Sequence, residues 1–205
     1  MKAWDKDHPK AGLMARKQAA ILGAAQREFL AKGFGETTMA GIAAAAGVSV
    51  ATLYRHASSK DELFEAVVTG RHDPEEIAAG LAMLAKLPLR EAMIIMGEGL
   101  LQSILSADAI GLHRMVIAEA DRFPQLGPLV YDAVLGHATG AVKRFLTERI
   151  AAAAADELAR DFVALLLGDR MVRALLGMPF AESPGERKAR VTAIVDGLDL
   201  PSPTA

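Results

Sequence analysis

The sequence predicts an all-α protein with a small N-terminal domain and a larger C-terminal domain. Ala, Leu, Glu and Arg are abundant, which favours helix, whereas the β-branched residues are scattered. Apolar residues recur at spacings of three and four, and no stretch alternates strictly. Hydrophobic residues make up 52% of the 205 residues and charged residues 23%, a composition that supports a sizeable buried core and excludes global disorder.

The first predicted helix covers residues 13–32, where Ile21, Ala25 and Phe29 share one face. Residues 1–12 are polar and mixed in charge, so we expect a flexible arm there rather than a signal peptide. Gly33 can end the helix with a left-handed residue, and Phe34 is placed for the hydrophobic contact that accompanies such a cap.

Two short helices follow, over residues 39–46 and 50–57. Thr37 or Thr38 can cap the first and Ser49 the second, and Gly47 forms the turn between them. Helices of about two turns are not stable alone, so they need the first helix as a platform. This arrangement is that of a helix-turn-helix domain.

A further helix begins near Lys60, capped by Ser58 or Ser59, and the domain boundary falls between residues 69 and 74. We therefore predict an arm over residues 1–12, a helix-turn-helix domain over 13–70 and a second helical domain over 71–205. The helices expected in the second domain lie near residues 75–86, 89–106, 108–121, 125–152, 156–178 and 184–197.

Charge and residue usage restrict the function classes. Residues 1–71 carry a net charge of +3 and the remainder −5, which suits a nucleic-acid-binding module joined to something else. The absence of cysteine excludes disulfides and thiolate metal sites or nucleophiles. No apolar run approaches the roughly 20 residues that span a bilayer. We expect a cytoplasmic protein with no membrane partner.

The residues now described resemble the N-terminal signature of the TetR family of transcriptional regulators. The resemblance covers residues 16–68 without gaps. It rests on Gly33-Phe34, Thr37-Thr38-Met39, Ile42-Ala43, Ala46-Gly47-Val48-Ser49, Thr52-Leu53-Tyr54-Arg55-His56 and Lys60-Asp61-Glu62-Leu63-Phe64. It implies a homodimer that binds double-stranded operator DNA, with recognition helices about 34 Å apart in successive major grooves.

The candidate DNA-contacting residues lie at the starts of these helices and along the recognition helix. Small residues at the start of that helix let it approach base edges, and polar groups at its far end reach phosphates. The set comprises Thr38, Ser49, Val50, Ala51, Thr52, Tyr54, Arg55, His56 and Lys60. Arg55 equally fits a side chain that faces solvent or pairs with an acid. The alternatives for the other two side chains are a packed aromatic residue at Tyr54 and a surface histidine at His56; the DNA-contacting interpretation is favoured over both.

Two positions depart from the family pattern. Ala57 stands where similar proteins usually carry phenylalanine, and Val50-Ala51 replaces a commoner pairing of proline or a basic residue with glycine. The second departure leaves the operator sequence open.

In the C-terminal part, Ile117–Leu126 and Phe162–Asp169 are similar to segments of AefR-like TetR regulators. This similarity implies a ligand-binding and dimerisation domain without identifying the effector. The expected dimer interface comprises Phe162, Leu165, Leu166, Val172, Leu176, Val191, Ile194 and Val195. The expected pocket is lined by Met93, Met96, Leu100, His113, Met115 and Tyr131, although methionines at helical spacing and a lone histidine are more often part of an ordinary core.

Few features of the sequence support another function. The five histidines show no HExxH spacing, and the sequence has no GxSxG, GxGxxG or phosphate-loop motif, so an enzyme has little support and we expect no metal or cofactor. A helix-turn-helix protein without a ligand would not need some 130 residues of apolar helix. A small molecule that releases a repressor from its operator is the favoured mechanism, and an activator of the same family is the alternative.

Overall fold

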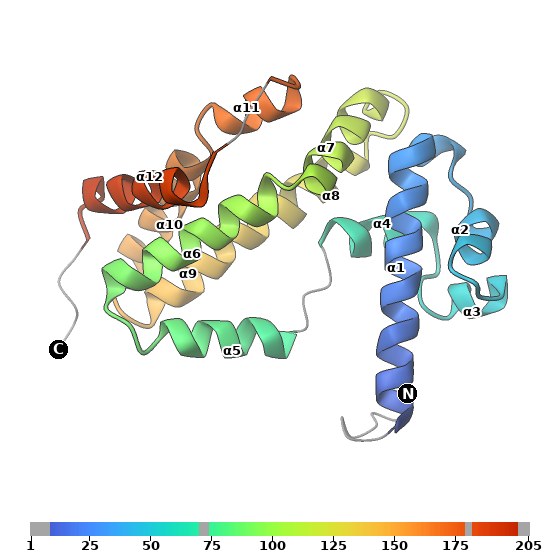
Figure 1. Cartoon of the computed structure of the whole chain (residues 1–205), viewed down its shortest axis with the longest axis horizontal. Coiled ribbons are helices and arrows are strands. Elements are labelled where there is room, and N and C mark those ends of the chain that lie inside the picture. Colours follow the sequence, from blue (N-terminus) through green and yellow to red (C-terminus); the bar gives the residue numbers. More distant parts are fainter. Residues whose placement is uncertain (1–8, 70–73, 179–181, 201–205) are drawn as a thin grey trace. The chain divides into compact units, whose positions relative to one another are not determined.

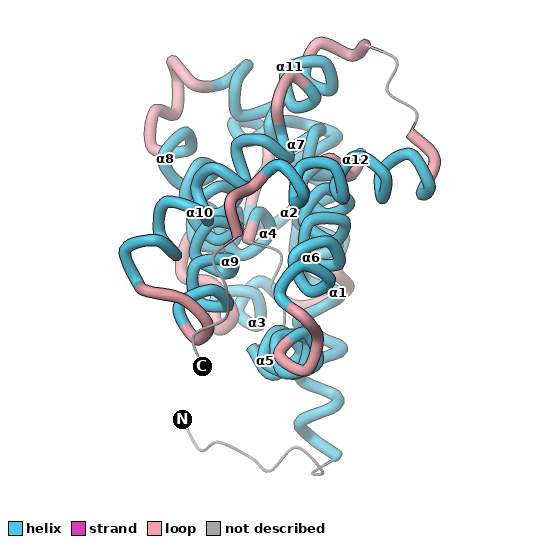
Figure 2. Tube along the Cα trace, turned by 90° about the vertical axis from the view of Figure 1, so that its left-hand side faces the viewer, coloured by secondary structure: helices cyan, strands magenta, loops and turns pink. Residues whose placement is uncertain are grey.

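In the computed structural model, the chain forms two compact units (Figure 1). The structure describes residues 9–69, 74–178 and 182–200, with the side chains of residue 14 and of 16–69, 79–178 and 182–200. One unit comprises Met1–Arg71 with Arg114–Val130, and the other comprises His72–His113 with Tyr131–Ala205. The regular secondary structure of the described residues is helical throughout (Figure 2), which confirms the predicted all-α class.

The N-terminal unit is built on α1 (Pro9–Glu36), against which α2 (Met39–Ala45) and α4 (Lys60–Val68) pack (Figure 1). The short α3 (Val50–Tyr54) packs on α2. These four helices occur where the sequence predicts them. Helix α1 starts earlier than expected, at residue 9, and the rest of the predicted arm, residues 1–8, lies outside the described residues.

An aromatic cluster holds this unit together. The rings of Phe29, Phe34 and Phe64 are fully or almost fully buried, with centroids 5.1–5.7 Å apart. Phe123 adds a fourth ring, edge-on to Phe34 at 5.0 Å. Burying a phenylalanine side chain contributes about 1.5–3 kcal/mol, so these rings are a main source of stability for a domain of this size.

Phe123 belongs to a segment that the sequence analysis assigned to the C-terminal domain. Helix α7 (Ala107–Glu119) lies partly in each unit, and residues 114–130 are grouped with the N-terminal unit. The predicted undivided domain over 71–205 therefore differs from the structure. The difference arises because residues in this segment contact residues that are far away in sequence.

The C-terminal unit has its core between α6 (Leu89–Ile104), α9 (His137–Thr147), α10 (Ala152–Leu167) and α12 (Pro184–Gly197). Phe162 and Val191 are completely buried in it. Helices α10 and α12 approach α6 so closely at Gly97 that a Cβ there would lie 2.7 Å from Val191 Cγ1 and 2.9 Å from Phe162 Cζ. The remaining helices are α5 (Pro74–Leu84), α8 (Leu126–Tyr131) and α11 (Arg170–Leu175).

Two predicted helices are interrupted. The helix expected over residues 125–152 consists of α8, a π-helical stretch over Asp132–Gly136, and α9. The helix expected over 156–178 starts at Ala152 and ends at Leu167, because Gly168 adopts a φ of 47°, before α11 begins.

No single helix among the described residues is long and apolar enough to cross a membrane. Helices α6 and α7 meet the length and composition criteria only when taken together, as a pair bent by 54°.

Candidate nucleic-acid interface

The turn between α2 and α3 depends on Gly47, whose φ of 66° suits a residue without a Cβ. The N–H of Val48 donates to the carbonyl of Ala43 (3.0 Å), which closes the turn. Ser49 then starts α3, and its hydroxyl accepts a hydrogen bond from the N–H of Thr52 (3.2 Å). The predicted turn and cap are confirmed.

Thr38, not Thr37, caps α2, because its hydroxyl accepts a hydrogen bond from the N–H of Gly41 (3.1 Å). Thr37 is buried, and its hydroxyl lies 2.7 Å from the carbonyl oxygen of Gly33 and 3.1 Å from that of Glu28. Thr37 therefore ties the end of α1 to the start of α2. Thr38 remains exposed at the end of a helix, where a phosphate can reach it.

Helix α3 presents one face to solvent. Leu53 is completely buried and fixes the helix on the core, whereas Val50 is 41% exposed and Tyr54 is 51% exposed. Ser49 and Ala51 are also exposed. The side chains at the start of α3 are therefore small and accessible, as entry into a major groove requires.

Thr52 does not share this exposed face. It is 8% exposed, and its hydroxyl oxygen accepts hydrogen bonds from the Ser49 hydroxyl (2.9 Å) and from Nη2 of Arg55 (3.0 Å). Thr52 was expected among the DNA-contacting residues, whereas these bonds give it a role in shaping the helix. Arg55 is exposed at the end of α3, and the adjacent His56 is half-buried.

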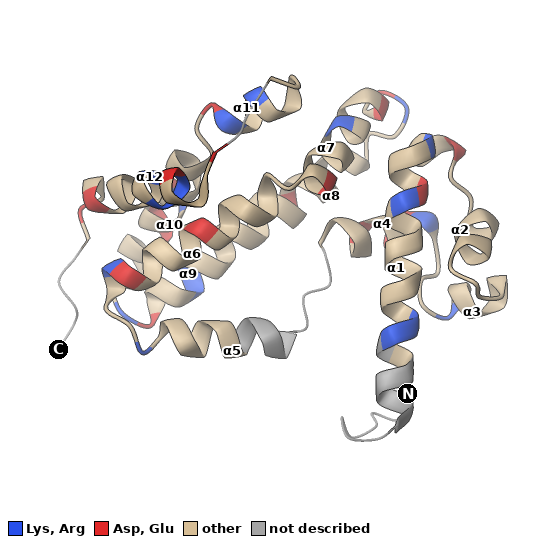
Figure 3. Ribbon diagram, viewed as in Figure 1, with Lys and Arg blue, Asp and Glu red and all other residues tan. Residues whose placement is uncertain are grey.

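The segment over residues 37–59 has a formal charge of +1, from Arg55. Residues 37–59 include Arg55 and His56 but no Asp or Glu. Figure 3 shows neither acidic nor basic ribbon on α2 and α3. Carboxylates from the flanking helices lie beside this segment: Glu62 accepts hydrogen bonds from Ser58 (2.6 Å), and Glu28 approaches Gly41 of α2. Helix α3 itself is uncharged, which leaves readout to shape, methyl contacts and hydroxyl groups.

The ammonium group of Lys60 is directed at the protein main chain. It donates hydrogen bonds to the carbonyl oxygens of Phe34 (2.6 Å), Thr37 (3.0 Å) and Gly35 (3.2 Å), and lies 4.4 Å from the centroid of the Phe34 ring. Three donors meet three acceptors, so Lys60 holds the α1–α2 connection in this structure. Lys60 is one of the expected DNA-contacting residues, and these contacts do not favour a contact to a phosphate.

Glu119 is the residue that sequence reasoning missed. Its carboxylate accepts hydrogen bonds from the N–H groups of Phe34 (2.6 Å) and Gly35 (2.9 Å). Gly33 lies beside this contact: its φ of 79° favours glycine, and a Cβ there would clash with Oε1 of Glu119. The contact joins residues 84 and 85 positions apart, so no local spacing predicts it; only the resemblance around residues 117–126 pointed to this segment.

The predicted pocket residues do not all lie together in the structure. Met93 and Met96 are buried in the core of the C-terminal unit, with Leu100 packed against them. His113 is half-buried, with Nδ1 2.6 Å from the carbonyl oxygen of Ala109. Met115 is grouped with the N-terminal unit, and Tyr131 is 63% exposed. The three residues of α6 are thus together in one core, and the other three are not part of that core.

The predicted dimer residues are divided as well. Four are buried inside the chain's own core and have little surface to offer a partner: Phe162, Leu166, Val191 and Val195. Ile194 is half-buried. Leu165, Val172 and Leu176 are 53%, 56% and 72% exposed. Periodicity identified an apolar helix but could not tell which side faces its own core.

Two family models match the chain. The model of the bacterial regulatory proteins of the tetR family matches residues 21–67, which span most of α1 through α4. The model of the AefR-like transcriptional repressor C-terminal domain matches residues 91–197, more than half of the chain. The resemblance noted in both parts of the sequence is confirmed.

Solved structures show the same fold. A TetR-family transcriptional regulator from Mesorhizobium loti is 27% identical, with a TM-score of 0.67 over 89% of this chain and 94% of that one. The flavonoid-responsive regulator FrrA is 28% identical, with a TM-score of 0.61 over the same shares. NalD of Pseudomonas aeruginosa, 18% identical with a TM-score of 0.55 over 89% and 94% of the two chains, shares the fold. No curated protein sequence matches the chain significantly. The chain belongs to the tetR family of bacterial regulatory proteins.

Proposed function

We propose that this transcriptional regulator is a homodimeric repressor that a small molecule releases from its operator. The observation that carries the DNA-binding part is the exposed face of α3, with Val50, Ala51 and Tyr54 accessible and Leu53 buried beneath them. Ser49, Thr38, Arg55 and His56 flank that face. We assign base and methyl contacts to Val50 and Ala51 and phosphate contacts to Tyr54, Arg55 and Thr38.

Dimerisation is supported by apolar surface on the C-terminal unit. Leu165 on α10 and Val172 and Leu176 on α11 are each more than half exposed. On α12, small exposed residues recur every four positions, which lets a second helix approach closely: Gly185, Ala189, Ala193 and Gly197. Two-fold symmetry also matches a palindromic operator with half-sites one helical turn apart.

Repression and ligand response rest on the relatives. The C-terminal family model describes a repressor, and the similar FrrA is named as flavonoid-responsive. We assign the response in this chain to a small organic molecule. Helix α7 is the proposed route of coupling, because it begins in the C-terminal unit and ends at Glu119, which bonds to the end of α1. A coupling free energy of about 1–3 kcal/mol is enough for a useful switch.

Selection of genomic DNA fragments by the purified full-length chain tests this proposal. A selected fragment is placed upstream of a reporter gene, and transcription is compared with and without the chain. A repressor lowers transcription, and its ligand restores it. A rise in transcription identifies an activator instead, and the recovery of no fragment above a scrambled-DNA control contradicts DNA binding altogether.

A further inference from the structure

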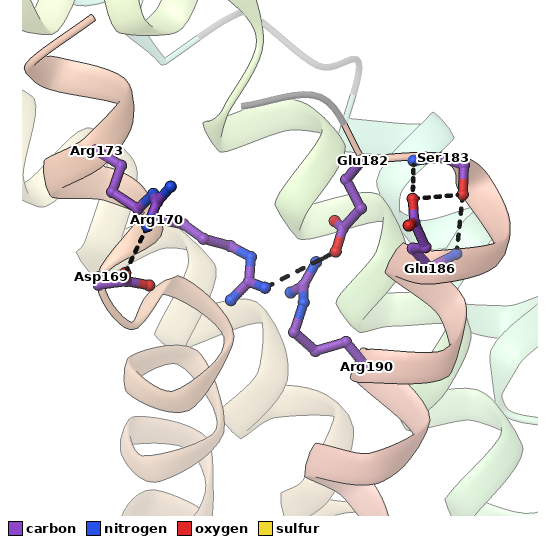
Figure 4. Close-up of polar contacts among 7 residues, drawn as sticks. All are labelled: Asp169, Arg170, Arg173, Glu182, Ser183, Glu186 and Arg190. Carbon is purple, nitrogen blue, oxygen red and sulfur yellow. Dashed lines mark hydrogen bonds and ion pairs between the residues drawn. The ribbon is translucent and has the colours of Figure 1, made fainter. Parts of the chain in front are cut away.

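Arginine side chains from two helices converge on one carboxylate in the C-terminal unit (Figure 4). Glu182 forms an ion pair with Arg170 of α11 (3.8 Å) and both an ion pair and a hydrogen bond with Arg190 of α12. Arg187 lies three residues before Arg190 and so on the same side of α12. We name these three arginines, with Glu182, the arginine cluster.

The start of α12 is fixed by a capping box. The hydroxyl of Ser183 accepts a hydrogen bond from the N–H of Glu186 (3.2 Å), and the Glu186 carboxylate accepts from the Ser183 N–H (2.8 Å) and hydroxyl (2.7 Å). The hydroxyl and N–H of Ser183 lower the pKa of Glu186. The Glu186 carboxylate is therefore held on the cap, and the capped helix gives Arg187 and Arg190 fixed directions.

The cluster holds more positive than negative charge. Arg170 and Arg190 share the carboxylate of Glu182, and Arg187 adds a third cation on the same side of α12. Asp169 pairs with Arg173 (3.7 Å) and also acts on the charge of Arg170, so three arginines meet two carboxylates. The side chains of Arg170 and Arg190 are only 21% and 18% exposed. Burial lowers the pKa of both, and the charge of Arg170 lowers that of Arg190 further. Partly buried cations are costly unless anions accompany them.

Two buried donors in the cluster have no acceptor among the described residues. These are Nε of Arg187 and Nη1 of Arg190. A buried N–H without an acceptor costs free energy, and most such groups in folded proteins are paired. Guanidinium groups match carboxylate and phosphate oxygens in a forked, bidentate geometry. The excess of positive charge and the two unpaired donors both indicate that the cluster can bind an anion.

We propose that Arg170, Arg187 and Arg190 bind the carboxylate or phosphate group of a small acidic molecule. Glu182 is the internal competitor, since it occupies part of the positive charge that the ligand would meet. The binding step is independent of the proposed function and is measured without DNA. Only the identification of this anion with the effector that releases the operator rests on the proposed function.

The test uses the purified full-length chain at constant ionic strength. Chloride is replaced by succinate in one series and by inorganic phosphate in a second, which separates a carboxylate ligand from a phosphate ligand. The midpoint of thermal unfolding is measured in each series, and calorimetry gives the Kd of each anion. Arg187→Gln and Arg190→Gln are each expected to weaken binding at least about tenfold. Arg173→Gln, which lies on the same helix as Arg170 but pairs with Asp169, is the matched control and should bind as the unmodified chain does.

Glu182→Gln supplies a test that misfolding cannot imitate. Removal of the competing carboxylate is expected to strengthen anion binding about tenfold, and a misfolded variant would lose binding instead. The proposal is overturned if neither anion binds more tightly than chloride to the unmodified chain and to Glu182→Gln. It is also overturned if Arg187→Gln and Arg190→Gln bind with unchanged Kd. Sedimentation velocity on the same variants covers the remaining case: loss of dimer without any anion binding would assign the cluster to a carboxylate of a second copy.

Discussion

The carboxylate of Glu119 lies 2.6 Å from the main-chain nitrogen of Phe34 and accepts its hydrogen bond. Lys60 donates to the carbonyl of the same residue (2.6 Å), so an anion and a cation satisfy the two main-chain groups of Phe34. This residue follows the non-helical Gly33 near the end of α1. The end of α7 is thereby bonded to the connection from which the helix-turn-helix begins.

Glu119→Gln tests this bond. An amide oxygen accepts more weakly than a carboxylate, so we expect the free energy of unfolding to fall by about 1–2 kcal/mol in urea titrations. Asp121→Asn, an exposed carboxylate two residues later, is the control and should change it by less than about 0.5 kcal/mol. Equal effects of the two substitutions would show that the contact to Phe34 contributes nothing specific.

Lys60→Met separates an internal role from a phosphate contact. The substitution removes donors to three carbonyl oxygens, so we expect a loss of about 2 kcal/mol in unfolding free energy. The salt dependence of DNA binding should stay unchanged. A slope of log K against log salt reduced by about one, with stability intact, would instead assign Lys60 to a phosphate. Lys32→Met, at a side chain 51% exposed, is the control for stability.

The helices and turns of the N-terminal unit could be predicted from the sequence because neighbouring residues determine them. Contacts between residues far apart in the sequence could not be predicted. Gly47 and Ser49 act within a few residues of their own positions, so their types alone predicted the turn and the cap. Glu119 acts on residues 84 and 85 positions away, which no spacing rule reaches. Leu165 and Leu166 are neighbours on an apolar helix, yet one is exposed and the other buried, because packing against α6 and α12 decides which side is inside.

Gly97→Ala is expected to destabilise the C-terminal core. The new methyl group would meet Val191, Phe162 and Leu166 at 2.7–3.3 Å, and overpacking of this kind costs about 1–3 kcal/mol. Gly99→Ala on the same helix meets nothing within 4 Å and should stabilise by about 0.5–1 kcal/mol through helix propensity. Thermal or urea unfolding of the pair checks this, and a stabilised Gly97→Ala would contradict the close approach of α6 to α10 and α12.

Ser183→Ala is expected to move the pKa of Glu186 back toward its ordinary value of 4.5, because the Ser183 side chain is the largest cause of its lowering. A carboxylate whose pKa is lowered on folding stabilises the folded state above that ordinary value. The contribution is lost as the pH falls through the lowered pKa. Titration of the Glu186 carboxyl by NMR measures the shift. The control is Ser103→Ala, at an exposed serine on α6, which should leave the pKa of Glu186 unchanged. An unchanged pKa of Glu186 in Ser183→Ala would show that the capping box does not form in solution.

The central claim is that the exposed face of α3 binds operator DNA, and Tyr54→Ala tests it most directly. The other tyrosine of the chain, Tyr131, is 63% exposed in the C-terminal unit, so Tyr131→Ala is a matched control. Fluorescence anisotropy with a selected operator, at two salt concentrations and with scrambled DNA as competitor, measures both affinities. We predict that Tyr54→Ala weakens specific binding at least about tenfold while Tyr131→Ala binds as the unmodified chain does. Unchanged binding by Tyr54→Ala, or an equal loss in both variants, would contradict the assignment of α3 as the DNA-contacting helix.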